Sequence, residues 1–229
     1  MPDVRRLLTD QIERLWGAGE LEVVWRNYSP DVVDRMPVPG QLGGLPGMEQ
    51  VVREFRAAMP DLRMTLHGTI VDGDPSCASR GCDWWTATGT NTGPLFGRPP
   101  TGRRVEIRGV DMIRAEGGRV AEIWHVEEML RFDAQLAGEP EPAIDPLAAF
   151  HAASSDLRVT EEAVLQEGPF RAVRSRVEGT HDAAPLLGIP PAGRRFSAAH
   201  MAVLRTRPDG APRLLTQVAE LAQVRAQLA

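Results

Sequence analysis

Apolar residues near the start of the chain recur at helical spacing, which predicts an amphipathic helix over residues 3–17. Two glycines, at positions 17 and 19, end this segment. Residues 20–28 predict a second short helix, residues 31–36 a short strand and residues 47–58 a third helix. A glycine-rich loop at 40–47 precedes the third helix, and Pro60 stops it. The first part of the chain is therefore mainly helical.

The apolar spacing then changes to every second residue, which is typical of half-buried strands. It predicts long strands over 62–72, 78–91, 103–115 and 119–128, with turns at Gly73-Asp74-Pro75 and Gly117-Gly118. Helices followed by an antiparallel meander predict an α+β fold, with the helices packed on one face of a curved sheet.

An internal repeat divides the chain into two parts. The segment GTNTGPLFGRPPTGRR, residues 89–104, returns as GTHDAAPLLGIPPAGRR at 179–195, and FRAAMPDLR at 55–63 returns as FHAASSDLR at 150–158. Residues 1–50 have no counterpart. We therefore expect a catalytic domain at 1–137, a Pro/Glu-rich linker at 138–144 and a truncated structural copy at 145–229, with one helix near 145–153 and four strands.

One helix is too little to cover both faces of a four-stranded sheet, and a monomer rarely exposes a large apolar face. We expect the second sheet to pack on the outer face of the first, around Val110, Met112 and Trp124, as an intramolecular pseudo-dimer. Further association into a homo-oligomer is compatible with this arrangement.

Several motifs together resemble the SnoaL-like polyketide (ester) cyclase family, which has the cone-shaped fold shared with nuclear transport factor two and ketosteroid isomerase. They are PDLR at 60–63, GTNTG at 89–93, GRPPTGRRVE at 97–106, GVDMIR at 109–114 and GGRVAEIWHV at 117–126. The resemblance implies cofactor-independent aldol closure of polyketide esters in antibiotic biosynthesis, driven by a carboxylate or histidine in the cone. The chain departs from the usual pattern at Asn91, where members have histidine, and at His125, where they have aspartate.

Asp111 is the leading catalytic candidate. Alternate residues of strand 103–115 are apolar on one face, and Asp111 is the exception among them. Because a carboxylate in a solid core is costly, its position indicates a cavity, which Ile107 and Ile113 on the same face would help to line. The alternative is a structural acid paired with an arginine.

Whether His125 faces Asp111 depends on the hairpin between their strands. A three-residue loop, 116–118, with Gly118 as a bulge would pair Ala115 with Arg119 and place Asp111 and His125 diagonally on one face. A two-residue Gly117-Gly118 turn would instead set Asp111 opposite Trp124 and turn His125 outwards. We favour the bulged form.

In that form Asp111 either orients His125 as the base or removes the proton itself. Asn91 and Trp85 have the same parity on the neighbouring strand, so they are candidates to bind an enolate oxygen and to stack on a flat ring. The alternatives are a turn-forming role for Asn91 and core packing for Trp85. The second copy has Ala202 and Gln217 at the positions of Asp111 and His125, so we expect no catalytic pair there.

Composition narrows the classes of function. The chain has a net charge of -5 with scattered arginines, which argues against nucleic-acid and membrane partners and favours a small polyketide-like molecule. All 26 basic residues are arginine, which excludes lysine Schiff-base chemistry. Two cysteines, Cys77 and Cys82, form neither a zinc motif nor a disulfide framework, and the remaining histidines show no metal-binding spacing. We expect no metal, no cofactor, no signal peptide and a cytoplasmic location.

These observations predict a polyketide cyclase-like enzyme that abstracts a proton from a carbon between carbonyls. Two rivals are a non-catalytic ligand-binding or accessory protein of the same fold, which the replaced histidine and aspartate favour, and an epoxide-opening hydrolase or cyclase.

Overall fold

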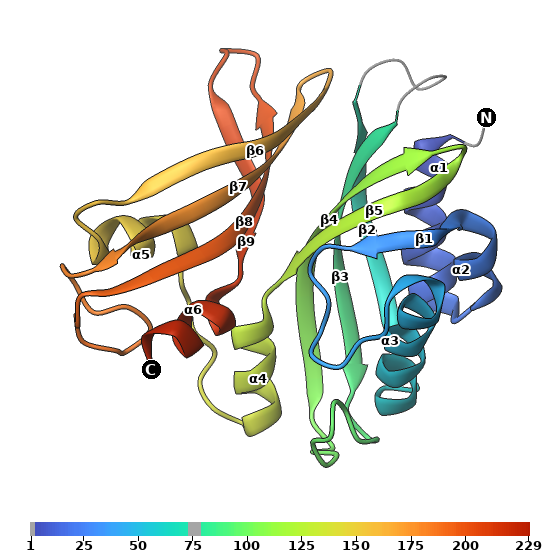
Figure 1. The fold of residues 1–229 in the computed structure, drawn as a ribbon, viewed down its shortest axis with the longest axis horizontal. Helices are drawn as coiled ribbons and strands as arrows, with labels where there is room; N and C mark the ends of the chain where they lie inside the picture. Colours follow the sequence, from blue (N-terminus) through green and yellow to red (C-terminus); the bar gives the residue numbers. More distant parts are fainter. Residues whose placement is uncertain (1–2, 73–78) are drawn as a thin grey trace.

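The computed structural model describes residues 3–72 and 79–229. The turn predicted at Gly73-Asp74-Pro75 and the first cysteine, Cys77, lie outside the described residues. Two sheets face each other in the structure, and most of the helices cover the far side of the first sheet (Figure 1).

The first copy contains a five-stranded sheet with strand order β1-β5-β4-β3-β2. Its strands are β1 (Tyr28–Asp34), β2 (Arg63–Val71), β3 (Arg80–Thr90), β4 (Arg104–Glu116) and β5 (Arg119–Glu127). The meander β2–β5 is antiparallel, as predicted, but the edge strand β1 runs parallel to β5. The parallel pairing is possible because the long connection from β1 to β5 includes a helix and the other strands.

The helices of the first copy are α1 (Val4–Thr9), a π-helical continuation η1 (Asp10–Ala18), α2 (Glu22–Asn27), α3 (Gly44–Ala58) and α4 (Met129–Ala137). The predicted helix over 3–17 corresponds to α1 with η1. Asp3 caps its start, because the Asp3 carboxylate accepts a hydrogen bond from the N–H of Arg5. Gly19, which has a positive φ, caps its end. Helix α2 is shorter than predicted because Tyr28 is already in extended conformation and starts β1. Helix α4 was not predicted.

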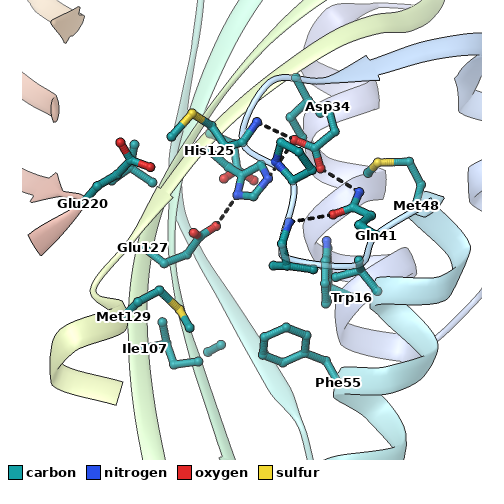
Figure 2. Close-up of a pocket in the computed structure, with 18 of the residues that line it drawn as sticks. Trp16, Asp34, Gln41, Met48, Phe55, Ile107, His125, Glu127, Met129 and Glu220 are labelled. Atoms are coloured by element: carbon teal, nitrogen blue, oxygen red, sulfur yellow. Dashed lines mark hydrogen bonds and ion pairs between the residues drawn. The ribbon is translucent and has the colours of Figure 1, made fainter. Parts of the chain in front are cut away.

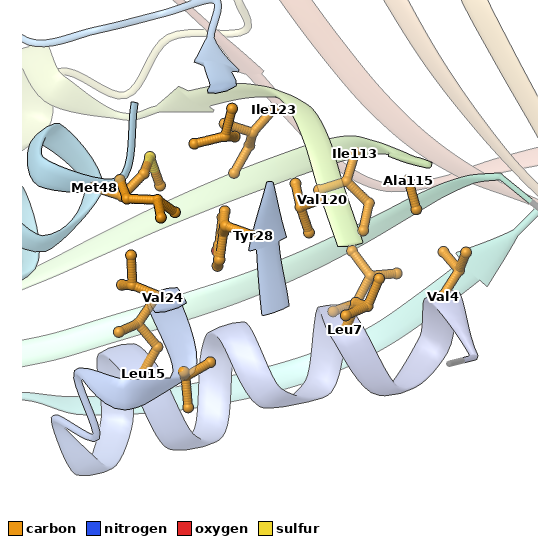
Figure 3. Close-up of a cluster of buried hydrophobic side chains, with 14 of the residues drawn as sticks. Val4, Leu7, Leu15, Val24, Tyr28, Met48, Ile113, Ala115, Val120 and Ile123 are labelled. Atoms are coloured by element: carbon orange, nitrogen blue, oxygen red, sulfur yellow. The ribbon is translucent and has the colours of Figure 1, made fainter. Parts of the chain in front are cut away.

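The apolar stripe of the N-terminal helices packs against the inner face of β4 and β5 (Figure 3). Leu7, Leu15 and Val24 from the helices pack in one cluster with Tyr28 of β1 and Ile113 of β4. This cluster fills one end of the cone with side chains. A second buried cluster, around Phe132 and Trp85, occupies the other end, and the polar site lies between them.

The second copy contains a four-stranded antiparallel sheet with order β6-β7-β8-β9. Its elements are α5 (Pro146–Ala153), β6 (Arg158–Glu167), β7 (Phe170–His181), β8 (Arg194–Thr206), β9 (Pro212–Ala219) and α6 (Leu221–Leu228). The prediction of a single helix was wrong, because α6 buries Val224 and Leu228 against Phe150 in the core of this copy. Helix α6 is the counterpart of α4, and both follow directly on the last strand of their copy.

The two copies share individual hydrogen bonds as well as sequence. The carboxylate of Asp61 accepts from the N–H and hydroxyl of Thr90, and Asp156 accepts in the same way from Thr180. Gln135 pairs through its amide with the backbone of Glu106, as Gln227 does with that of Ser197. These conserved contacts within one chain support duplication of a common unit.

The outer faces of the two sheets pack against each other, as predicted. Val110 and Met112 of the first sheet form one buried cluster with Met201 and Val203 of the second, and Trp124 packs against it. The Arg174 guanidinium lies 4.3 Å from the centre of the Trp124 ring. The chain is therefore an intramolecular pseudo-dimer.

Across residues 3–72 and 79–229, no helix has the length and apolar character required to cross a membrane.

Candidate active site

A cavity of about 270 Å³ lies on the helix-covered side of the first sheet. Its wall is mostly apolar, with Trp16, Phe55, Trp85 and Ile107 among the larger side chains. The polar or titratable groups on the wall are Asp34, Gln41, Asp111, His125, Glu127, Glu220 and Gln223. A mostly apolar cavity with a few converging polar groups is the usual form of a small-molecule site.

Asp111 lies at the floor of this cavity, with an exposed fraction of 4%. Its Oδ2 accepts a hydrogen bond of 2.6 Å from the side-chain amide of Gln11, whose own oxygen accepts from the Tyr28 hydroxyl at 2.6 Å. Its Oδ1 has no hydrogen-bond partner among the described residues. Burial raises the pKa of Asp111 to about 7, with a smaller opposing effect from the charge of His125.

The alternative of an arginine partner for Asp111 is not what the structure shows, because its hydrogen bond comes from a neutral amide. Asp83 lies directly opposite on β3 and is also buried, with both oxygens unpaired among the described residues. Burial, and next the charge of Asp111, raises the pKa of Asp83 well above its ordinary value. Its surroundings therefore favour the protonated form of Asp83.

His125 is held between two carboxylates on the cavity wall (Figure 2). Its Nδ1 lies 2.7 Å from Oε1 of Glu127, and its Nε2 lies 3.0 Å from Oδ1 of Asp34. Burial alone would lower the pKa of His125, but the two carboxylates raise it well above its ordinary value. The imidazole is therefore a cation whose two N–H groups are both engaged.

Asp34 is itself held in place at the end of β1. It accepts from the backbone N–H of Met36 and from the side-chain amide of Gln41, both at 2.9 Å. Burial would raise its pKa, but the hydrogen bond and charge of His125 lower it overall. The prediction that Asp111 orients His125 is therefore wrong in its partner, since Asp34 and Glu127 perform that role.

The hairpin between β4 and β5 sets Asp111 opposite His125, but through a bulge at another position than the one predicted. Glu116 pairs with Arg119 across a two-residue Gly117-Gly118 turn, so the predicted three-residue loop is wrong. The register then shifts at Ala121, because Ala115 pairs with Val120 and Arg114 with Glu122. This bulge restores equal parity and sets Asp111 directly opposite His125 instead of diagonally.

Trp85 and Ile107 line the cavity, where the sequence placed them. The indole of Trp85 lies over Gly109 on the next strand, and a Cβ built on that glycine would come within 2.3 Å of the ring. Its Nε1 has no hydrogen-bond partner among the described residues. The N–H lies close enough to Asp111 to lower the pKa of that carboxyl slightly, without the geometry of a direct hydrogen bond.

Asn91 and Ile113, predicted to bind substrate, lie elsewhere. The Asn91 side chain holds the loop after β3, since its oxygen accepts from the N–H of Thr101 at 2.9 Å and its nitrogen donates to the carbonyl of Gly93 at 2.8 Å. This is the turn-forming alternative. Ile113 is buried in the cluster beneath the N-terminal helices, because the cavity ends before that level of the cone.

Sequence reasoning missed six polar residues of the site: Gln11, Asp34, Gln41, Glu127, Glu220 and Gln223. Glu127 had a usable signal, because it lies two residues after His125 and therefore on the same strand face. Gln11 lies within a helix, and Glu220 belongs to the copy that was expected to be structural only. Contacts of that kind depend on the tertiary arrangement.

The equivalent face of the second copy has none of this chemistry. Ala202 and Gln217 are paired there as Asp111 and His125 are in the first copy, which confirms the predicted equivalence. Gln217 Oε1 lies 3.2 Å from Nε2 of His200. His181, at the position of Asn91, is fully buried and pairs with the carbonyl of Ala184. In the described ranges, no group of three or more metal-ligating side chains is present.

A cone-shaped α+β domain with a buried carboxyl and an imidazole in an apolar cavity can serve in either an enzyme or a ligand-binding protein. The profile of the SnoaL-like polyketide cyclase family matches residues 6–136 and again residues 140–228. The chain therefore belongs to this family and carries two copies of its domain.

Solved structures agree with the fold. TsrD from Streptomyces laurentii is 26% identical, with a TM-score of 0.51, over 58% of this chain and 93% of that one. A candidate SnoaL-like polyketide cyclase from Jannaschia sp. CCS1 is 19% identical, with a TM-score of 0.52, over 60% of this chain and 95% of that one. Each of these two proteins thus aligns over nearly its whole length with little more than half of this chain. No curated protein matches it.

Proposed function

We propose that the protein is a cofactor-independent cyclase-like enzyme of secondary metabolism, acting in the cytoplasm on a polyketide-like molecule. In this proposal it removes a proton from a carbon between two carbonyl groups and so starts an intramolecular aldol closure. The observation that carries the proposal is a buried carboxyl, Asp111, on the wall of an apolar cavity beside Trp85, with one oxygen that has no hydrogen-bond partner among the described residues.

Asp111 is the base in this proposal. A pKa near 7 makes its carboxylate basic enough to accept a proton and still leaves much of it ionised at neutral pH. Oδ1 takes the proton, and the C–H electron pair moves into the adjacent carbonyl to form an enolate. The enolate carbon then attacks a second carbonyl of the same molecule, whose oxygen takes the proton back from Asp111 to become the aldol hydroxyl and so regenerates the carboxylate.

Trp85 and His125 would stabilise the negative charge that develops. The indole N–H of Trp85, which has no hydrogen-bond partner within residues 3–72 and 79–229, lies beside Asp111 and is suited to donate to the enolate oxygen. His125 has both N–H groups engaged by carboxylates, so it supplies positive charge and does not act as a base. The replaced histidine of the family motif does not remove this machinery, because both Asn91 and its counterpart His181 bond within loops.

Deuterium exchange into a 1,3-dicarbonyl probe, 1-naphthoylacetone in D₂O, tests the proposal by NMR after subtraction of the uncatalysed rate. Asp111→Asn and His125→Ala should each lower the catalysed exchange by about 100-fold or more. His67→Ala is the matched control, because His67 is exposed and bonds to Thr86 outside the cavity. Binding of the probe without Asp111-dependent exchange would identify a binding protein instead.

A further inference from the structure

Part of the cavity wall comes from the second copy. Glu220, Ala222 and Gln223, at the start of α6, line the cavity together with Glu127 and Met129 of the first copy. Figure 2 shows Glu220 on the second copy's side of the pocket, while His125 and Glu127 lie on the first copy's side. Without residues 145–229 this wall would be missing, so the pocket is a composite of the two copies.

The carboxylate of Glu220 has a fixed position. Its Oε2 accepts from the backbone N–H of Ala199 at 2.9 Å. In the amide orientation that satisfies both of its ends, the side-chain nitrogen of Gln223 donates to Oε1 at 3.1 Å and to Oε2 at 2.8 Å. Burial raises the pKa of Glu220, as does the charge of Glu127, so the two carboxylates are near enough to interact. A half-buried carboxylate held in this way offers a preformed acceptor to a ligand.

The lining of the pocket has a one-sided charge. Its titratable groups are Asp34, Asp111, His125, Glu127 and Glu220, which are four carboxyls and one imidazole. The chain has 26 basic residues, all of them arginine, yet none is among the lining residues. One imidazolium, His125, lies between the two carboxylates of Asp34 and Glu127, so with Glu220 the wall has more acidic than basic groups.

A second observation points to a ligand at this place. Asp111 has an exposed fraction of only 4%, lines the same cavity and has an oxygen without a partner among the described residues. The rest of the wall is apolar and includes Trp16, Phe55 and Trp85. The surroundings therefore suit a flat apolar body with a positively charged group at one end, and they oppose a carboxylate or phosphate.

We propose that Glu220 of the second copy is a ligand-binding residue, and that the ligand class is a flat apolar molecule bearing a protonated amine placed between Glu127 and Glu220. This inference rests on the proposed function only in taking the cavity as the ligand site. It gives the degenerate copy a direct part in specificity, through charge-assisted hydrogen bonds to the ammonium group.

Three probes of one shape test it by titration calorimetry on the full chain at pH 7.5: 2-naphthylmethylamine, 2-naphthalenemethanol and 2-naphthoate. The amine should bind at least tenfold more tightly than the alcohol, and naphthoate should bind most weakly. Glu220→Gln should weaken amine binding about tenfold, the usual scale for a hydrogen bond to a charged group, and should leave alcohol binding within twofold.

Glu178→Gln is the matched control, because it removes the same charge from the second copy at a position outside the cavity. It should leave all three affinities unchanged. Ala222→Arg provides a variant of opposite sign: it adds a cation to the same wall, so it should weaken amine binding and strengthen naphthoate binding. Unchanged amine and naphthoate affinities in Ala222→Arg, or equal losses for all three probes in Glu220→Gln, would overturn the inference.

These probes lack an acidic carbon between carbonyls, so the result is independent of turnover. Naphthoate binding as tightly as the amine, with Asp111-dependent exchange intact, would overturn this inference and leave the proposed function standing. Preference for the amine without Asp111-dependent exchange would support this inference and contradict the proposed function.

Discussion

Asp111 and His125 are direct neighbours across β4 and β5, but different surroundings control their protons. Burial favours the neutral form of Asp111, and two carboxylates favour the cationic form of His125. The pattern of strand 103–115 was sufficient to single out Asp111, because a polar residue interrupting an apolar face is visible in sequence. Asp34 was missed because the pairing of β1 with β5 is not visible in the sequence, whereas Glu127 could have been inferred from its place two residues after His125 on the same strand.

The raised pKa of Asp111 also has a consequence for stability. The folded protein binds this proton up to about pH 7, while the unfolded chain releases it near 3.8, so folding stability falls as pH rises from about 4 to 7. Asp111→Asn removes this decline. The free energy of unfolding of Asp111→Asn should exceed that of wild type by almost nothing at pH 4 and by up to about 4 kcal/mol at pH 8.

Urea unfolding at the two pH values measures this difference. Asp133→Asn serves as a control, because Asp133 pairs with Arg98 at the surface of α4. The same stability difference between Asp111→Asn and wild type at both pH values would show that Asp111 ionises normally in the folded protein.

At the scale of elements, strand register determines the site. The alternation along 103–115 and 119–128 predicted two strands correctly, but a one-residue bulge is invisible to a pattern of period two. The bulge at Ala121 decides which face carries His125. Helices α4 and α6 were missed because each is short, nine and eight residues, and follows directly on the last strand of its copy.

Trp85 of β3 packs closely on Gly109 of β4. Gly109→Ala would place a methyl group where the Trp85 ring lies, so the ring must move or the strands must separate. We expect a loss of stability of about 1–3 kcal/mol, the range for overpacking, together with a change in tryptophan fluorescence.

Gly43→Ala is the matched control, since a Cβ there meets nothing within 4 Å and the backbone is extended. A wild-type melting temperature and emission spectrum in Gly109→Ala would indicate that Trp85 does not pack on this glycine.

At the scale of the whole molecule, the repeat and the need to cover a second sheet were enough to predict an intramolecular pseudo-dimer. In the structure, Val110 and Met112 of the first sheet form one buried cluster with Met201 and Val203 of the second sheet. The composite pocket was not predicted, because it depends on how α6 is placed against the first copy.

Separating the copies should therefore expose this cluster. Residues 1–142 alone should aggregate or self-associate, and residues 143–229 alone should lack a cooperative melting transition. Light scattering and calorimetry check the two fragments. A stable, monodisperse monomer of residues 1–142 with full activity would mean that the second copy is dispensable.

The central claim is that the carboxylate of Asp111 removes the proton, and the pH dependence of catalysed deuterium exchange tests it most directly. Because the carboxylate is the active form, exchange into 1-naphthoylacetone should rise with pH through about 7 and then level off in wild type. Asp111→Asn should lose this rise. A wild-type profile without a transition between pH 5 and 9, or an unchanged transition in Asp111→Asn, would contradict the assignment.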